Sequence, residues 1–210
     1  MYSTSYSTEK DPQAVLDFMK QHPFAMLVGS LNDIPAVTQV PLLVEERDGK
    51  LYLLGHIMRG TDHYKAFSGN PNVLCVFTGA HSYVSASWYT DQKMASTWNY
   101  MSVQARGRLS FLDDASLLDI LERTTVHFEN NEASPASYKN LSPDYIQHHA
   151  KAIVAFEIEV TSLKHTFKLS QNRNKESYDN IIQHLHQRDP DAQGVAREME
   201  ARKDRLFKEQ

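Results

Sequence analysis

Between Phe24 and Leu112 the chain carries a succession of short segments that are β-branched, aromatic or alternately apolar and polar, and this succession constrains the fold more than any other feature. The predicted strands cover residues 24–30, 36–45, 51–56, 73–79, 81–87 and 97–112. Turn-forming pairs such as Asn32-Asp33 and Asp48-Gly49 separate several of them. Because few helices lie between the strands, we expect a mainly β protein whose antiparallel sheet forms a closed or nearly closed barrel rather than a doubly wound sheet.

Helix signals flank this succession. Asp11 before Pro12 is typical of an N-cap followed by the first helical residue, and it predicts a helix that ends at His22-Pro23. Further helix starts are predicted at Asp113 or Asp114, at Ser142-Pro143, near Asn174 and at Asp189-Pro190. One more strand is predicted at residues 152–161, and residues 166–170 can continue the sheet.

The composition indicates an ordinary folded protein. A hydrophobic content of 41% is enough to build a core. The single cysteine, Cys75, cannot form an internal disulfide, and we expect it to be a buried, unreactive thiol in its apolar strand. The polar segment Met1–Lys10 has no apolar signal region, and no apolar run approaches the roughly 18 residues that a membrane helix needs. We therefore expect a cytoplasmic protein that does not interact with membranes.

Cationic side chains follow the apolar strand at residues 51–56. Arg59 can donate two parallel charge-assisted hydrogen bonds to a phosphate, and Gly60 allows the backbone to approach a ligand closely. Lys65 lies on the first turns of a predicted short helix. A nucleotide-like phosphate is therefore the first candidate ligand. The alternative is a strand-to-helix turn whose Arg59 and Lys65 are merely solvated.

Two further clusters have the side chains that a planar ligand needs. Trp98 can pack on a planar ring, and Asn99 offers both a donor and an acceptor to the edge of a heterocycle. The alternative is an ordinary strand with aromatic residues in the core. Gln171, Asn172 and Arg173 follow an apolar strand exit, where they either contact the carbonyl and imide edge of a flavin or cap the helix that begins near Asn174.

Several other site patterns are missing from the sequence. Neither G-x-G-x-x-G nor G-x-x-x-x-G-K-[ST] occurs, so a phosphate would have to be held by side chains and strand-end amides. The ten histidines show no spacing typical of a metal site, and no metal is expected. No G-x-S-x-G motif is present, and no catalytic residue is assigned. From Asn172 onward eight Lys or Arg balance eight Asp or Glu, which gives no support to a DNA-recognition helix.

Taken together, four separated motifs resemble the PaiB family of FMN-binding negative transcriptional regulators. In chain order they are Gly55-His56-x-x-Arg59, Ser85-x-Ser87-Trp88-Tyr89, Thr97-Trp98-Asn99-Tyr100 and Lys168-Leu169-Ser170-Gln171-Asn172-Arg173. The resemblance extends from Pro23 to about Arg173. It departs at Met58 and Ala86, where the family tends to have Ala and Pro.

The resemblance implies a six-stranded antiparallel split β-barrel with flanking and C-terminal helices, similar to the pyridoxamine-phosphate-oxidase-like proteins that bind FMN between the two subunits of a homodimer. Residues 1–173 would form the FMN-binding domain, and residues 174–210 a helical extension packed on the barrel or on the dimer partner. In the implied FMN site, Arg59 and Gly60 bind the phosphate with help from Lys65 and His56. The strand containing Thr38, Gln39, Val40 and Pro41 runs beneath the isoalloxazine, Trp98 and Asn99 approach the ring, and Gln171 and Arg173 close the site.

The resemblance implies an FMN-binding protein that acts as a negative transcriptional regulator, for which the charge balance predicts weak DNA binding. One alternative is an FMN-dependent oxidoreductase that acts on a small planar substrate, because a flavin itself supplies redox chemistry. A third hypothesis is a haem-binding protein on the same barrel, suggested by the number of histidines.

Overall fold

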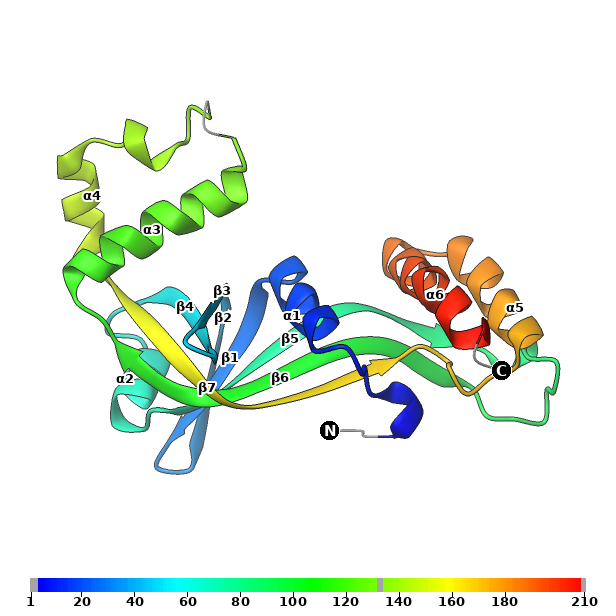
Figure 1. Ribbon diagram of the computed structural model, residues 1–210. Coiled ribbons are helices and arrows are strands. Elements are labelled where there is room, and N and C mark those ends of the chain that lie inside the picture. Colours follow the sequence, from blue (N-terminus) through cyan, green and yellow to red (C-terminus); the bar gives the residue numbers. More distant parts are fainter. Residues whose placement is uncertain (1–3, 132–133, 209–210) are drawn as a thin grey trace. The chain divides into compact units, whose positions relative to one another are not determined.

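The computed structural model describes residues 4–131 and 134–208 (Figure 1). Within these ranges the strands are β1 (Phe24–Leu31), β2 (Ile34–Pro41), β3 (Leu43–Arg47), β4 (Lys50–Met58), β5 (Asn72–Val84), β6 (Thr97–Phe111) and β7 (Ile153–Lys168). The α-helices are α1 (Pro12–Gln21), α2 (Asp62–Gly69), α3 (Asp114–Glu129), α4 (Pro143–Ala150), α5 (Lys175–His186) and α6 (Pro190–Lys208). Short 3-10 turns are η1 (Ser5–Ser7), η2 (Ala86–Trp88) and η3 (Tyr138–Asn140).

The chain divides into two compact units. Unit 1 comprises Met1–Phe18, Thr78–Val103 and Lys164–Gln210, and unit 2 comprises Met19–Phe77 and Gln104–Leu163. The boundaries fall inside α1, β5, β6 and β7, so each of these elements has residues in both units.

The strands pair in the order β2-β1-β5-β6-β7-β4-β3. The pairs β1–β2, β1–β5, β3–β4 and β4–β7 are antiparallel, which confirms the predicted mainly β, antiparallel fold. The expected six-stranded barrel is not what the described residues form, because they contain seven strands in an open order that ends at β2 and β3. Within unit 2 the sheet is nevertheless curved: a Cβ placed on Gly55 in β4 would lie 3.1 Å from the carbonyl oxygen of Pro41 in β2.

One additional strand arises because the predicted strand 36–45 is interrupted. Leu42 is buried, and its backbone N–H donates to the carbonyl oxygen of Pro23 (2.9 Å) rather than to a neighbouring strand of the ladder. The interruption separates β2 from β3, which take positions at opposite ends of the strand order.

Two other predicted boundaries are absent from the structure. The segments 73–79 and 81–87 were expected as separate strands, but β5 runs continuously to Val84 and is followed by η2. Val73, Cys75 and Phe77 are buried in its first half, whereas Ser82 and Val84 are buried in its second half. The buried positions thus shift from odd-numbered to even-numbered residues. In the sequence this shift resembles a turn between two strands, although the backbone stays extended. β7 is continuous in the same way, with exposed residues at 161–164 between its two buried halves.

The helix starts were predicted well because each depends on a local cap. The N–H groups of the first turns donate to the side chains of Asp11, Asp113, Ser142, Asn174 and Asp189 at 2.9–3.2 Å. The predicted division at Asp189-Pro190 is confirmed, and α5 and α6 lie side by side in unit 1 (Figure 1). Residues 1–3 of the polar N-terminal segment, residues 132–133 and residues 209–210 lie outside the described ranges.

Cys75 is buried in β5 as expected, and burial raises the pKa of its thiol to about 12. Among the described residues, no helix is both long and apolar enough to cross a membrane. No group of three or more His, Cys, Asp or Glu side chains in the same part of the chain is arranged to hold a metal ion.

Candidate functional site

Arg59 lies directly after β4 in unit 2, where its backbone and its guanidinium are both held by the start of β7. Its N–H donates to the carbonyl oxygen of Ala152 (2.8 Å), and its Nε donates to the carbonyl oxygen of Ile153 (2.9 Å). Its Nη2 lies 3.9 Å from a carboxylate oxygen of Asp114, and 40% of the side chain is exposed. The Nε bond fixes the plane of the guanidinium, while the two terminal nitrogens make no hydrogen bond to any described residue. The two Nη groups are therefore available to donate a pair of parallel hydrogen bonds to a ligand.

The turn after Arg59 is constrained and open. Gly60 has a φ of 79°, in the left-handed region that favours glycine, and no atom beyond its two chain neighbours lies within 4 Å of the position that a Cβ would occupy. Thr61 caps α2: its hydroxyl accepts from the N–H of Tyr64 (3.2 Å) and donates to the carbonyl oxygen of Met58 (3.0 Å). The turn thus leaves space beside a fixed cation.

Lys65 and His56 lie on the elements that flank this turn. Lys65 is exposed on α2, and its N–H donates to the carbonyl oxygen of Thr61 (3.1 Å). His56 is partly buried in β4, opposite Ala155 in β7. Burial lowers the pKa of His56, so the imidazole is neutral at physiological pH and can act as a hydrogen-bonding group rather than as a cation.

The strand predicted to run beneath a ring, Thr38–Pro41, is the second half of β2. Thr38 pairs with Leu27 and Gln39 with Met26, so one edge of β2 is satisfied by β1. β2 ends the strand order, and its second edge is not paired with another strand among the described residues. Val40 is buried, whereas Gln39 is exposed. Backbone groups on the outer edge are therefore the ones that β2 offers to a ligand.

The remaining predicted residues, Trp98, Asn99, Gln171 and Arg173, belong to unit 1. Trp98 in β6 is 53% exposed, and its ring centroid lies 6.1 Å from that of Tyr83. Asn99 is fully buried: its Oδ1 accepts from the hydroxyl of Ser170 (3.0 Å), and its Nδ2 lies 3.5 Å from the sulfur of Met199. The Trp98 ring is thus accessible to a ligand, whereas the Asn99 amide is engaged inside unit 1.

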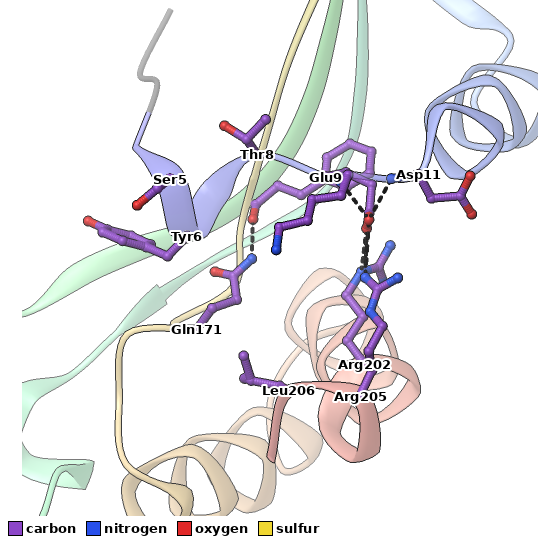
Figure 2. Close-up of a pocket in the computed structure, with 11 residues that line it drawn as sticks. Ser5, Tyr6, Thr8, Glu9, Asp11, Gln171, Arg202, Arg205 and Leu206 are labelled. Atoms are coloured by element: carbon purple, nitrogen blue, oxygen red, sulfur yellow. Dashed lines mark hydrogen bonds and ion pairs between the residues drawn. The ribbon is translucent and has the colours of Figure 1, made fainter. Parts of the chain in front are cut away.

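Gln171 and Arg173 diverge at the exit of β7. The Gln171 side chain folds back on the strand, where its Oε1 accepts from the N–H of Leu169 (2.7 Å) and its amide donates to the carbonyl oxygen of Phe167 (Figure 2). The Arg173 guanidinium lies over the ring of Tyr89, 4.3 Å from its centroid, and its Nη1 is 2.8 Å from the sulfur of Met94. Capping of α5 belongs to Asn174 alone, so it does not explain the two long polar side chains before it.

Sequence reasoning missed the groups that orient Arg59 and Arg173. A backbone carbonyl, that of Ile153, has no sequence signature at all. Tyr89 was part of a recognised motif, but only the structure shows that its buried hydroxyl and the Nε of Arg173 both find no hydrogen-bond partner among the described residues. Two neighbouring unsatisfied polar groups are uncommon in a folded protein.

The residues around Arg59 fit a phosphate monoester. The guanidinium supplies an oriented fork, Gly60 leaves open space next to it, and Lys65 adds an exposed positive charge on the next helix. This fit concerns only the phosphate end of a ligand such as FMN. The candidates for contacts with the flavin ring on β6 and after β7, namely Trp98, Asn99, Gln171 and Arg173, lie in unit 1.

The chain shares its fold class with two solved structures. The structure is similar to the flavocytochrome Anf3 from Azotobacter vinelandii, with a TM-score of 0.60, 17% identity and coverage of 85% of this chain and 78% of that one. It is also similar to a FAD and heme binding protein from Mycobacterium smegmatis, with a TM-score of 0.55, 14% identity and coverage of 76% and 72%. At these identities the likeness concerns the fold alone.

The sequence comparisons identify the family within that class. Residues 1–162 match the family model described as "Putative FMN-binding domain". The chain is 31% identical over 201 residues to the "Protease synthase and sporulation protein PAI 2" of Bacillus subtilis, which covers 95% of this chain and 97% of that protein. The chain therefore belongs to this FMN-binding family, the PaiB family that its motifs resemble, and the prediction of FMN as the cofactor is confirmed.

Proposed function

We propose that this protein holds FMN by its phosphate on the turn that contains Arg59 and Gly60, and that it serves as a negative transcriptional regulator of the PaiB type. The observation that carries the proposal is the Arg59 guanidinium, which the Ile153 carbonyl fixes in one plane while its terminal nitrogens stay available. Lys65 contributes positive charge, and neutral His56 contributes a hydrogen bond.

The ring of FMN lies along the outer edge of β2, where Thr38, Gln39, Val40 and Pro41 offer backbone groups. As residues of a second subunit, Trp98 packs against the ring and Arg173 approaches its edge. Asn99 and Gln171 have a supporting role instead, because the buried Asn99 holds Ser170 and Gln171 holds the end of β7. The exposed aromatic surface of unit 1, formed by Tyr83 and Trp98, supports burial against such a partner. The active form is thus a homodimer that binds FMN at its interface.

In this arrangement residues 1–173 form the FMN-binding domain, and residues 174–210 are a helical extension packed on it or on the partner. FMN supplies redox chemistry when it is bound. The protein itself neutralises the phosphate through Arg59 and positions it at Gly60.

The proposed regulatory role derives from the family and not from a DNA-binding surface, and the proposed cytoplasmic location rests on the sequence expectation alone. The cations of α5 and α6 are largely engaged within unit 1: Lys203 lies 2.6 Å from Asp179, and Lys175 lies 3.2 Å from the same carboxylate. Few positive charges therefore remain for DNA phosphates, and direct DNA binding is weak.

The test is a titration of the flavin-free protein with FMN, followed by flavin fluorescence and by the melting temperature, together with gel filtration at saturation. Saturable binding by a species of twice the subunit mass is expected. The absence of any FMN-dependent rise in melting temperature at ligand concentrations well above micromolar would contradict the proposal. A monomer that binds FMN fully would contradict the dimeric site but leave the phosphate site standing.

A further inference from the structure

In unit 1 an aromatic ring, rather than a carboxylate, holds the guanidinium of Arg173. Its Cζ lies 4.3 Å from the centroid of the Tyr89 ring, and its Nη1 lies 2.8 Å from the sulfur of Met94. A cation this close to an aromatic face is attracted by the ring quadrupole, and more strongly where water is excluded. Within residues 4–131 and 134–208 the guanidinium forms no ion pair with a carboxylate, so no described residue neutralises its charge.

Hydrogen bonds tie together the two segments that carry these side chains. The N–H of Thr90 donates to the hydroxyl of Ser177 (2.9 Å), and the Nδ2 of Asn174 donates to the hydroxyl of Thr90 (2.9 Å). Tyr89, directly before Thr90, is only 3% exposed. Both segments are therefore fixed at the point where the ring and the guanidinium meet.

The backbone that leads to Arg173 is also held in an uncommon conformation. Ser170 has a φ of 60°, in the left-handed region that residues other than glycine rarely adopt. Its hydroxyl donates to Oδ1 of the fully buried Asn99 (3.0 Å), and the N–H of Arg173 donates to the carbonyl oxygen of Ser170 (3.0 Å). Strained backbone of this kind persists where the surrounding structure holds it, and it is frequent at ligand-binding sites. The start of the Arg173 side chain is thus fixed independently of the ring.

The contact depends on the face of the Tyr89 ring and not on its hydroxyl. The Tyr89 hydroxyl and the Nε of Arg173 are both buried and have no hydrogen-bond partner among the described residues. Because neither atom is accessible, a ligand can be reached only through the Nη side of the guanidinium. The hydroxyl makes no hydrogen bond that Tyr89→Phe would remove, so this substitution isolates the contribution of the ring.

We propose that Tyr89 is a positioning residue, which holds the Arg173 guanidinium at the edge of the flavin ring so that its charge favours the reduced state of FMN. This inference rests on the proposed function, in which Arg173 approaches that edge. Reduction of FMN takes up two electrons from a donor and one proton from water, and it leaves one negative charge on the ring. A fixed cation that no carboxylate neutralises stabilises that charge more than it stabilises the neutral oxidised ring. Tyr89 thus acts through Arg173 and does not itself contact the flavin.

The measurement is the two-electron reduction potential of bound FMN, obtained by titration with dithionite in the presence of a reference dye, together with the affinity for oxidised FMN. Arg173→Gln should weaken the binding of reduced FMN by about tenfold more than that of oxidised FMN, the effect of losing a charged contact, which lowers the potential by about 30 mV. Tyr89→Leu should lower the potential too, whereas Tyr89→Phe should leave it unchanged. In the double variant, Tyr89→Leu should add nothing to Arg173→Gln, because the ring acts only through the guanidinium.

A second replacement covers the case in which Tyr89→Leu does not fold. Pentafluorophenylalanine in place of Tyr89 keeps the shape of the ring but reverses its quadrupole, so it should lower the potential without opening a cavity. Lys50→Ala in unit 2 is the matched surface control: it removes an exposed cation and should leave the potential unchanged.

An unchanged potential in Arg173→Gln would overturn the proposal, because the guanidinium would then not act on the ring. The same holds if pentafluorophenylalanine leaves the potential unchanged, or if Tyr89→Phe lowers it as much as Arg173→Gln does. Equal weakening of both redox states in the Tyr89 and Arg173 variants would show a structural role only. Absence of FMN binding by the unmodified protein would instead refute the proposed function, and this inference with it.

Discussion

Replacement of Arg59 by alanine removes the side chain on which the proposed phosphate site depends. The substitution also removes two contacts within the protein, and their effect must be separated from the effect on FMN affinity. The ion pair with Asp114 spans 3.9 Å, and the Asp114 side chain is 93% exposed, so its loss should change stability very little. The bond from Nε to the carbonyl oxygen of Ile153 orients the guanidinium, and that carbonyl can be solvated once the side chain is gone.

The remaining effect of Arg59→Ala is the loss of the free energy that the two Nη groups contribute to FMN binding. A hydrogen bond to a charged group contributes about 1.5–3 kcal/mol. The dissociation constant of FMN should therefore rise by roughly 10- to 150-fold in Arg59→Ala, since each 1.4 kcal/mol corresponds to about a factor of ten. Arg59→Lys should retain part of the affinity, because it keeps the charge but loses the planar fork and the Nε donor.

The assay is a titration of FMN fluorescence quenching with flavin-free protein at two ionic strengths. Lys50→Ala is the control: it removes an exposed cation at the opposite end of β4, about 30 Å away at the usual rise per residue, and should leave affinity unchanged. An affinity of Arg59→Ala within about twofold of the unmodified protein would refute the reasoning, because a charged contact contributes more than that. The phosphate would then be held elsewhere.

Three further outcomes are expected. Burial lowers the pKa of His56 from its ordinary value of 6.5, so the unfolded chain takes up a proton that the folded protein does not; the free energy of unfolding should fall as the pH drops through 6.5, as urea denaturation can measure. Gly107→Ala should destabilise unit 2 by about 3 kcal/mol or more, because the added Cβ would lie 2.4 Å from the carbonyl oxygen of Glu159. DNA binding, measured by fluorescence anisotropy, should be weak and should decrease steeply with added salt.

Each of these has its own control. His56→Gln should reduce the dependence of stability on pH near neutrality, and an unchanged slope would place the responsible proton elsewhere. Gly49→Ala has a φ of 74° and no neighbour within 4 Å, so it should lose only about 1 kcal/mol from the left-handed backbone; equal effects at both glycines would contradict the steric argument. A nanomolar, salt-insensitive DNA complex would show that the proposed weak binding is wrong.

Local interactions explain which parts of the fold could be predicted from the sequence. Helix starts at Asp113, Ser142 and Asn174 were predictable because each cap is an interaction between a side chain and an N–H two or three residues away. The strand-to-helix turn at Arg59 and Gly60 was predictable for the same reason. Its cation and its glycine are adjacent in the chain, and the left-handed φ of 79° needs no distant partner.

Long-range pairing explains what the sequence left open. The interruption at Leu42 depends on the carbonyl of Pro23, and the continuity of β5 through its change of phase depends on neighbouring strands that a pattern of apolar residues does not specify. The open order of seven strands follows from these two facts together with the position of β7 between β6 and β4.

The sequence by itself determined the family, the cofactor and the residue types of the candidate site, because motifs carry chemistry in fixed local order. Only the tertiary structure decided the state of each side chain. It fixed Arg59 against Ile153, buried Asn99 beside Ser170, and placed the Arg173 guanidinium over the ring of Tyr89. The physical reason is that burial and hydrogen-bond satisfaction depend on groups distant in sequence, and no local pattern encodes which of them will meet.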